Sequence, residues 1–214
     1  MEKPREAPCN APQSRREARR EERREAILDI AARYFLERGY AATSMSGIAA
    51  ALGGSKGTLW KYYASKDLLF EAVLDRAIGE FRSQLSLALN PHQPVQVALR
   101  EFCSRYVGRL TQPEGIALHR VVMAEVSRFP EIGRIFYERA PHQVQVLLAA
   151  FLDKAMEKGE LRRFDPAEAA QYLTALCMAK SHLKMLTGVT PLLTHAEAEA
   201  DAEAAIEVFL RAYA

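Results

Sequence analysis

The stretch TSMSGIAAALGGSKGTLWKYYASK, residues 43–66, decides the fold. Apolar residues at helical spacing predict a helix over residues 43–51, and Gly53 and Gly54 end it. Ser55 is expected to cap a further helix that runs to about residue 63. Two short helices joined by a glycine turn, with three lysines and no acidic residue, are typical of a helix-turn-helix that docks on DNA.

The second of these helices is predicted to divide into a core side and an outer side. Leu59 and Tyr63 are four residues apart and point into a small core. Lysines can supply charge to phosphates and guanines, a threonine can contact a base, and a glycine allows close backbone approach. The outward set is Lys56, Gly57, Thr58, Trp60, Lys61 and Tyr62.

Helix N-termini on either side of this segment are further candidate DNA contacts. Thr43 is expected to cap the helix over residues 43–51, next to Ser44, and Ser65 to start a fourth helix at Lys66. Free amides and the positive end of the helix dipole suit phosphate at such positions.

The chain before this motif is rich in arginine. Residues 1–20 are expected to form a disordered basic and polar tail, and an amphipathic helix begins near Arg24 and ends at Gly39. The stretch SRREARREERREA, residues 14–26, mixes both signs of charge at helical spacing. Two interpretations stay open for it, a solvated extension of the first helix and an arm that enters the minor groove.

Charge is distributed unevenly between the two ends of the chain. Residues 14–66 carry eleven Arg and Lys against six Asp and Glu, whereas residues 67–214 carry sixteen against nineteen, which separates a polyanion-facing end from an ordinary body. No apolar run approaches the roughly 20 residues that span a bilayer, and the N-terminus is not built as a signal peptide. We expect a cytoplasmic protein with no membrane segment, no metal, no cofactor and reduced cysteines.

Residues 24–70 closely resemble the DNA-binding domain of TetR/AcrR-type transcriptional regulators. The family pattern runs roughly T-x-x-x-I-A-x-x-x-G-V-S-K-G-T-L-Y-x-Y-F-x-S-K-x-x-L. With one residue more between Thr43 and Ile48 than the pattern has, it is matched at Thr43, Ile48, Ala49, Gly53, Ser55, Lys56, Gly57, Thr58, Leu59, Tyr62, Ser65, Lys66 and Leu69. Gly54, Trp60 and Tyr63 depart from it, with glycine for valine, tryptophan for tyrosine and tyrosine for phenylalanine.

The resemblance implies a role for each matched position. The third helix would be the recognition helix in the major groove, and Thr43, Tyr62 and Lys66 would contact phosphates. The residues nearest the bases would be Lys56, Gly57, Thr58, Trp60 and Lys61. A dimer reading a palindromic operator is implied, because one motif reads too few bases for useful specificity.

The remainder of the chain is predicted to be helical throughout, which makes the protein all-α. A helix-turn-helix domain over residues 21–66 would precede a helical bundle over residues 67–214 that binds an effector and dimerises. VVMAEVSRFPEIGRIFYERAP, residues 121–141, resembles the AefR-like subgroup. By the same resemblance the last two helices form a four-helix bundle with a second copy. The apolar face for it is Leu173, Leu176, Ile206, Phe209 and Leu210, with packing inside one subunit as the alternative.

An apolar cavity is a further implication of the resemblance. Its candidate lining is Phe102, Tyr106, Met123, Phe136, Tyr137, Phe151, Met178 and His182, for each of which plain core packing is the alternative. Such a composition favours a small hydrophobic or aromatic effector. The predicted function is that of a repressor released from DNA by this effector. The alternatives are an architectural DNA-binding protein without an effector and a helical-bundle enzyme, for which the sequence offers no phosphate loop or metal spacing.

Overall fold

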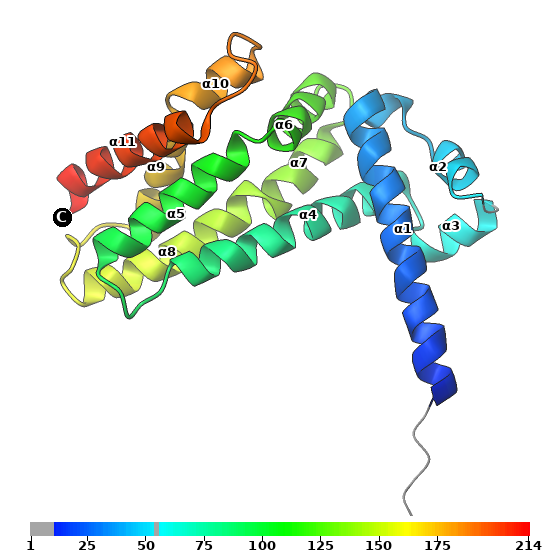
Figure 1. The fold of residues 1–214 in the computed structure, drawn as a ribbon, viewed down its shortest axis with the longest axis horizontal. Helices are drawn as coiled ribbons and strands as arrows, with labels where there is room; N and C mark the ends of the chain where they lie inside the picture. The colour runs from blue at the N-terminus through cyan, green and yellow to red at the C-terminus, as the bar shows by residue number, and fades with distance from the viewer. Residues whose placement is uncertain (1–10, 54–55) are drawn as a thin grey trace, which may run out of the picture.

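The computed structural model describes residues 11–53 and 56–214, with side chains placed for residues 15–53 and 57–214. These residues form helices and no strand, which confirms the all-α prediction. A small domain of α1 to α3 lies at one end, and α4 leads from it into a larger bundle (Figure 1). The helices are α1 (Ala11–Ala42), α2 (Met45–Ala51), α3 (Lys56–Tyr62), α4 (Lys66–Ala88), α5 (Val95–Leu110), α6 (Pro113–Glu125), α7 (Pro130–Arg139), α8 (Pro141–Glu157), α9 (Pro166–Met178), α10 (Ser181–Leu186) and α11 (His195–Tyr213).

The first helix is longer than predicted at its N-terminus. Residues 11–20 belong to α1, so the expectation of a disordered tail is wrong for them, while residues 1–10 lie outside the described part. Arginine, glutamate and alanine are strong helix formers, which accounts for the extension. Near the other end, Gly39 adopts φ 79° and interrupts the helix as predicted, a backbone conformation that favours glycine.

Side-chain caps fix where several helices begin. The Ser44 hydroxyl accepts a hydrogen bond from the Gly47 amide, so Ser44 caps α2 and the prediction of Thr43 as the cap is wrong. Ser65 caps α4 as predicted, through the Leu68 amide. Asp165 and Thr194 cap α9 and α11 in the same way.

The N-terminal domain packs around one aromatic cluster at its junction with the bundle. Phe35, Tyr40 and Phe70 have ring centroids within 5.8 Å of one another, and Phe129 from the α6–α7 turn lies 5.2 Å from Tyr40. Residues from α1 to α4 therefore share a core with α6 and α7. The small domain is tied to the bundle through this shared core as well as through α4.

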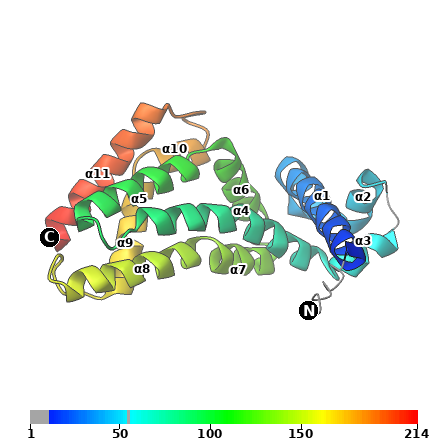
Figure 2. The same cartoon turned by 60° about the horizontal axis from the view of Figure 1, so that its bottom comes forward.

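The second core belongs to the bundle alone. It is built from α4, α5 and α8, with α9 and α11 packed against them at the far end from the helix-turn-helix (Figure 2). Although the chain after the helix-turn-helix is predicted to be helical throughout, α9 and α10 are separate helices. The backbone breaks at Lys180, and the Asp201 carboxylate of α11 accepts a hydrogen bond from the Ser181 amide. Of the described helices, none is long and apolar enough to cross a membrane.

Candidate nucleic-acid interface and effector pocket

The outer side of α3 carries the exposed part of the helix-turn-helix. Leu59 and Tyr63 are buried as predicted, whereas Trp60 is 49% exposed and Lys61 and Gly57 are exposed. We call Gly57, Trp60 and Lys61 the α3 face. An indole, an ammonium group and an accessible backbone lie together on it, which provides stacking or packing area, positive charge and close approach to a nucleic acid surface.

Other predicted DNA-contact residues lie at the edges of this face. Thr58 and Tyr62 are partly buried, and the Tyr62 ring packs against the domain core. Ser44 is exposed at the start of α2, where its hydroxyl is engaged by the Gly47 amide. The predictions for Ser55 and for the Lys56 side chain lie outside the described residues.

Thr43 and Lys66 are turned inward rather than toward a DNA surface. Thr43 is 1% exposed, and its hydroxyl donates to the carbonyl oxygens of Gly39 at 2.8 Å and Tyr34 at 3.0 Å. The Lys66 ammonium donates to the Tyr40 carbonyl at 2.8 Å and lies 4.0 Å from the centre of the Tyr40 ring. The Thr43 side chain is thus enclosed by protein, whereas the Lys66 side chain is held by Tyr40 and stays partly exposed. Both hold the end of α1 in place.

Burial also affects the pKa of Lys66. Its ammonium is partly removed from water, and this desolvation lowers the pKa of Lys66, while the carboxylates of Asp67 and Glu125 act in the opposite direction. Asp67 also accepts a hydrogen bond from the Tyr40 hydroxyl. The junction between the two domains is therefore a compact polar cluster around Tyr40.

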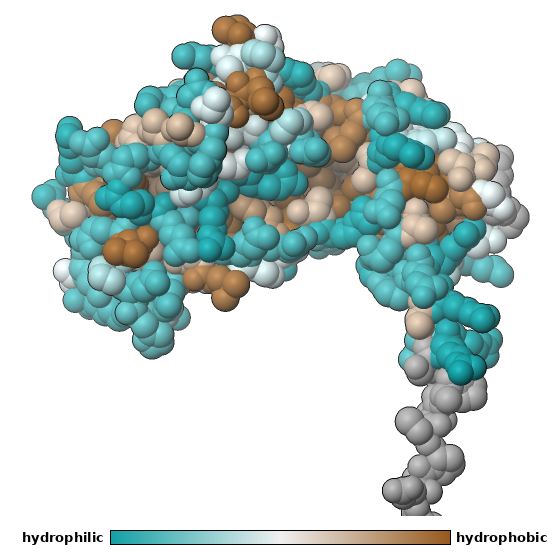
Figure 3. Space-filling model, in the orientation of Figure 1, coloured by the Kyte–Doolittle hydropathy of each residue, from teal (hydrophilic) through white to brown (hydrophobic). Residues whose placement is uncertain are grey.

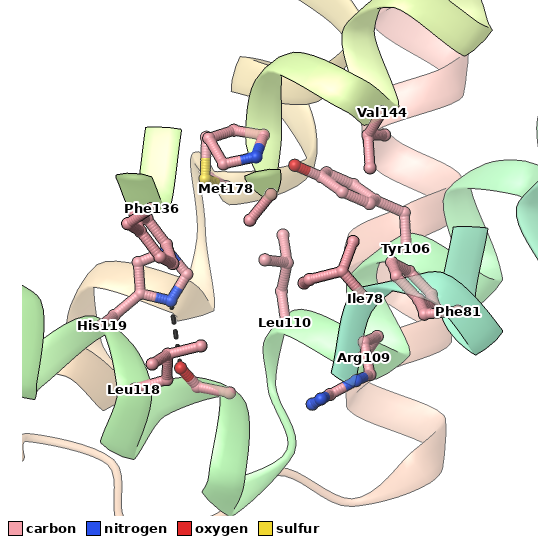
Figure 4. A pocket seen from close by; sticks show the side chains of 13 residues that line it. Ile78, Phe81, Tyr106, Arg109, Leu110, Leu118, His119, Phe136, Val144 and Met178 are labelled. Atoms are coloured by element: carbon pink, nitrogen blue, oxygen red, sulfur yellow. Dashed lines mark hydrogen bonds between the residues drawn. The ribbon is translucent and has the colours of Figure 1, made fainter. Parts of the chain in front are cut away.

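A pocket lies inside the bundle between α4, α5, α6, α7, α8 and α9. Rings of Phe81, Tyr106, His119 and Phe136 surround it together with aliphatic side chains, and Met178 closes one side (Figure 4). The remaining lining is Ile78, Arg109, Leu110, Gly115, Leu118, Ala140, Pro141 and Val144. The space left between these atoms is about 70 Å³, well below the roughly 300–1,000 Å³ of ligand pockets. A ring-containing ligand must therefore push the lining helices apart.

Three of the predicted pocket residues line this space, namely Tyr106, Phe136 and Met178. Phe102 and Phe151 lie in the bundle core instead, and Phe102 stacks behind Tyr106 with centroids 5.6 Å apart. Met123 is 64% exposed and Tyr137 is 51% exposed, so the prediction is wrong for both. They lie on the outer faces of α6 and α7. The prediction failed because helical spacing alone does not show which face of a helix meets its neighbours.

Two histidines lie together at one side of the pocket, where His119 belongs to the lining and His182 packs against it. The His119 ring hydrogen-bonds through Nδ1 to the Gly115 carbonyl at 3.0 Å, and its centroid lies 5.0 Å from the ring of His182. His182 is buried, and its Nε2 has no hydrogen-bond partner among the described residues. Burial lowers the pKa of both imidazoles, and the neighbouring His119 lowers that of His182 further. The pair is therefore held neutral near pH 7.

Gly115 and Glu125 show how α6 connects the pocket to the helix-turn-helix. A Cβ at Gly115 would lie 2.8 Å from the Arg109 carbonyl, so glycine allows the start of α6 to sit directly against the end of α5 beside the pocket. Ten residues after Gly115, at the last residue of the helix, the Glu125 carboxylate accepts a hydrogen bond from the Ala41 amide at 2.9 Å. One helix thus contacts both the pocket and the end of α1.

The predicted dimer residues fall on two sides of the last helices. Leu173, Ile206 and Phe209 are almost fully buried in their own subunit, so packing inside one subunit accounts for these three. Leu176 and Leu210 are partly buried at the edge of that core. A groove lies on the outer side of the same two helices, and its lining is Tyr172, Ala175, Leu176, Ala179, Val208, Phe209, Ala212 and Tyr213.

Metal and thiol chemistry have little support in this molecule. Within residues 11–53 and 56–214, no three His, Cys, Asp or Glu side chains are grouped so that they could hold a metal ion. Cys103 and Cys177 are free thiols and are buried. A hydrogen bond with Cys177, together with burial, raises the pKa of Cys103. Such thiols are poor nucleophiles, and they serve as small apolar core residues.

The fold and the α3 face define a helix-turn-helix DNA-binding regulator with a separate helical domain around a pocket. Comparison with known proteins gives the family. Residues 27–73 match the family model described as bacterial regulatory proteins of the tetR family, and residues 97–214 match the C-terminal domain of AefR-like transcriptional repressors. The chain belongs to the TetR family of transcriptional regulators, and this assignment excludes the enzyme alternative.

Individual relatives agree with this assignment. The HTH-type transcriptional repressor ComR of Escherichia coli (strain K12) is 28% identical over 160 residues, which cover 73% of this chain and 76% of ComR. The flavonoid-responsive regulator FrrA is 32% identical, with a TM-score of 0.72 over 88% of this chain and 95% of FrrA. A TetR transcriptional regulator from Agrobacterium tumefaciens is 26% identical, with a TM-score of 0.71 over 89% of this chain and 94% of that chain.

Proposed function

We propose that this regulator represses transcription by binding a palindromic operator as a homodimer, and that a small aromatic effector releases it. The observation that carries the DNA-binding part is the α3 face, where Trp60 and Lys61 project from a helix whose other side is buried. Ser44, Ser55, Lys56, Thr58 and Tyr62 complete the proposed interface at its edges. Because its target is DNA, we also propose a cytoplasmic location.

Dimerisation is proposed to use the outer groove of α9 and α11. Tyr172 and Val208 are about half exposed there, a high exposure for apolar side chains on a helical bundle. Ala175, Ala179 and Ala212 are small, which lets the helices of a second copy approach closely. A two-fold axis through this groove would place one α3 on each half of a palindrome.

The effector is proposed to be a planar, ring-containing molecule. The rings of Phe81, Tyr106 and Phe136 give the pocket flat apolar walls, and Arg109 provides a positive group at its edge. FrrA is named for its response to flavonoids, and this chain covers most of its length. Flavonoids and related phenols are therefore the first compounds to test.

Release is proposed to follow from the tight pocket and the position of α6. Since the pocket holds only about 70 Å³, a bound ring displaces α6 from α5 and α7. Movement of α6 shifts Glu125 and with it the end of α1, which alters the placement of the helix-turn-helix. A ligand acts in this way only if it binds the displaced arrangement more tightly than the present one.

Selection of bound sequences from random DNA tests the proposal as a whole. The purified protein should enrich a palindrome whose half-sites lie about one helical turn, roughly 34 Å, apart. A flavonoid that binds the pocket should lower the affinity for the enriched site. Enrichment of no sequence, or of a single unrepeated half-site, would contradict the dimeric operator.

A further inference from the structure

The N-terminal part of α1 sorts its charges onto two faces. At 3.6 residues per turn, the arginines between residues 15 and 24 all fall on one half of the helix surface, and the glutamates of residues 17–25 fall on the other half. The arginines, which we call the arginine face, are Arg15, Arg16, Arg19, Arg20, Arg23 and Arg24. A solvated helix needs no such separation, because mixed signs at i and i+4 stabilise it better.

Contacts at the inner end of this segment fix the direction of each face. Arg23, near the middle of the arginine face, donates to the Leu52 carbonyl at the end of α2 at 3.4 Å. On the opposite face, Glu25 and Asp29 pair with Arg76 of α4, at 3.1 and 2.7 Å. The arginine face therefore lies on the side of the helix-turn-helix, and the acidic face lies on the side of α4.

The outer arginines are available for a partner. Arg15, Arg16, Arg19 and Arg20 are exposed, and none of them forms an ion pair with another side chain in the described ranges. This end of α1 projects past α3 and is covered by hydrophilic residues (Figures 1 and 3). From Arg15 to Arg24 the helix extends roughly 14 Å, a length that passes several phosphates at about 3.4 Å of rise per strand.

We propose that the arginine face of α1 binds the phosphate backbone of the DNA that flanks each half-site. The proposal rests on the proposed operator binding by α3, whose face lies on the same side of the domain. Charge complementarity favours DNA as the occupant, since the glutamates of this segment, which DNA would repel, lie on the opposite half of the helix from the arginines. The arginine face would lengthen the footprint and add affinity without adding sequence specificity.

The test uses the full chain and the operator enriched from random DNA, in two duplexes. One duplex carries about 15 base pairs of flanking sequence on each side, and the other ends at the half-sites. The variant Arg16→Gln with Arg19→Gln neutralises the arginine face. Arg162→Gln with Arg163→Gln removes the same charge from two exposed residues between α8 and α9, in the domain far from α3.

Binding is measured by fluorescence anisotropy between 50 and 200 mM salt. On the long duplex, wild type and the Arg162/Arg163 control should lose affinity roughly 150-fold more over this range than the Arg16/Arg19 variant, because four phosphate contacts, two from each subunit, contribute a log–log slope of about 3.6. On the short duplex all three proteins should have the same salt dependence. Equal slopes for the two double variants on the long duplex would overturn the arginine-face proposal.

A second variant separates this failure from a failure of operator binding. Trp60→Ala with Lys61→Ala should lose preference for the enriched site while keeping its dependence on flanking length. If wild type shows as little preference for the enriched duplex over a scrambled one as this variant does, operator binding through α3 is itself wrong. If only the arginine-face difference is missing, operator binding stands and the flanking contact is withdrawn.

Discussion

The α3 face and the bundle pocket differ in how many elements build them. Trp60 and Lys61 are placed by one short helix packed on two neighbours, so their exposure follows from local spacing. The pocket takes its wall from six helices, and its lining changes if any one of them rotates. A site made by one element is stable to small movements elsewhere, whereas a site made by many responds to them. That contrast suits a regulator that reads DNA with one region and senses a ligand with the other.

The largest expected effect comes from removing the α3 face. Trp60→Ala with Lys61→Ala should lower operator affinity at least 100-fold, because stacking and a charged contact are lost from each half-site. Flavonoid binding and the thermal unfolding midpoint should be unchanged, since both side chains are exposed. Arg134→Ala with Tyr137→Ala, an exposed cation and ring on α7, is the matched control and should bind DNA normally. Wild-type affinity in the α3 variant would remove α3 from the interface.

A smaller loss of DNA binding should follow from blocking the outer groove of α9 and α11. Ala175→Glu places two carboxylates near the proposed two-fold axis and should give a monomer by light scattering. Operator affinity should fall by about 10- to 100-fold while the monomer keeps weak binding to a single half-site. Ala150→Glu on the exposed side of α8 is the control. A dimer that survives Ala175→Glu would place the interface elsewhere.

Breaking the contact that links the pocket to the helix-turn-helix is expected to have a smaller effect than either substitution above. Glu125→Ala removes the acceptor of the Ala41 amide, and should reduce the effect of a bound flavonoid on operator affinity by about 1–2 kcal/mol. Affinity for the flavonoid in the absence of DNA should change little, because Glu125 does not line the pocket. Glu125→Gln keeps an oxygen acceptor and should retain most of the coupling. Full coupling in both variants would mean that α6 acts by another route.

The smallest effect concerns the histidine pair. Burial holds the pKa of His119 and His182 below 6.5, so the folded protein takes up these protons less readily than the unfolded chain. Stability from the pair is complete above pH 6.5 and is lost as the pH falls below it. His182→Phe should therefore reduce the drop in the urea midpoint between pH 7.5 and 5.5, whereas the exposed His92→Gln should not. Identical pH profiles for all three proteins would count against a neutral buried pair.

The α3 face could be predicted from the sequence better than the pocket, because one helix builds the face and six helices build the pocket. The helix-turn-helix, the inward Leu59 and Tyr63 and the outward Trp60 follow from spacing within one short segment. The hydrogen bond of Lys66 to the Tyr40 carbonyl does not follow from spacing, because that carbonyl becomes accessible where Gly39 bends α1. The prediction that Met123 lines the pocket is wrong because the opposite face of α6 meets the pocket.

The same limit explains the pocket residues that sequence reasoning missed. Leu118 and His119 have no distinguishing local pattern, and only the packing of α6 against α7 and α10 brings them to the cavity. Leu173 and Phe209 carried the right apolar signal for α9 and α11, but that signal does not separate a subunit's own core from a dimer face. The small residues Ala175 and Ala179, one helical turn apart, are the sequence feature that indicates the outer face of α9.

The most direct measurement uses the single tryptophan of the chain, Trp60, which lies half exposed on the α3 face. Its fluorescence is followed while the unmodified protein is titrated with the enriched operator and with a scrambled duplex of equal length. At moderate salt, we expect the operator alone to quench or shift the emission and a pocket-binding flavonoid to reverse the change. Emission that stays the same when the operator is bound would contradict the central claim that α3 reads the DNA.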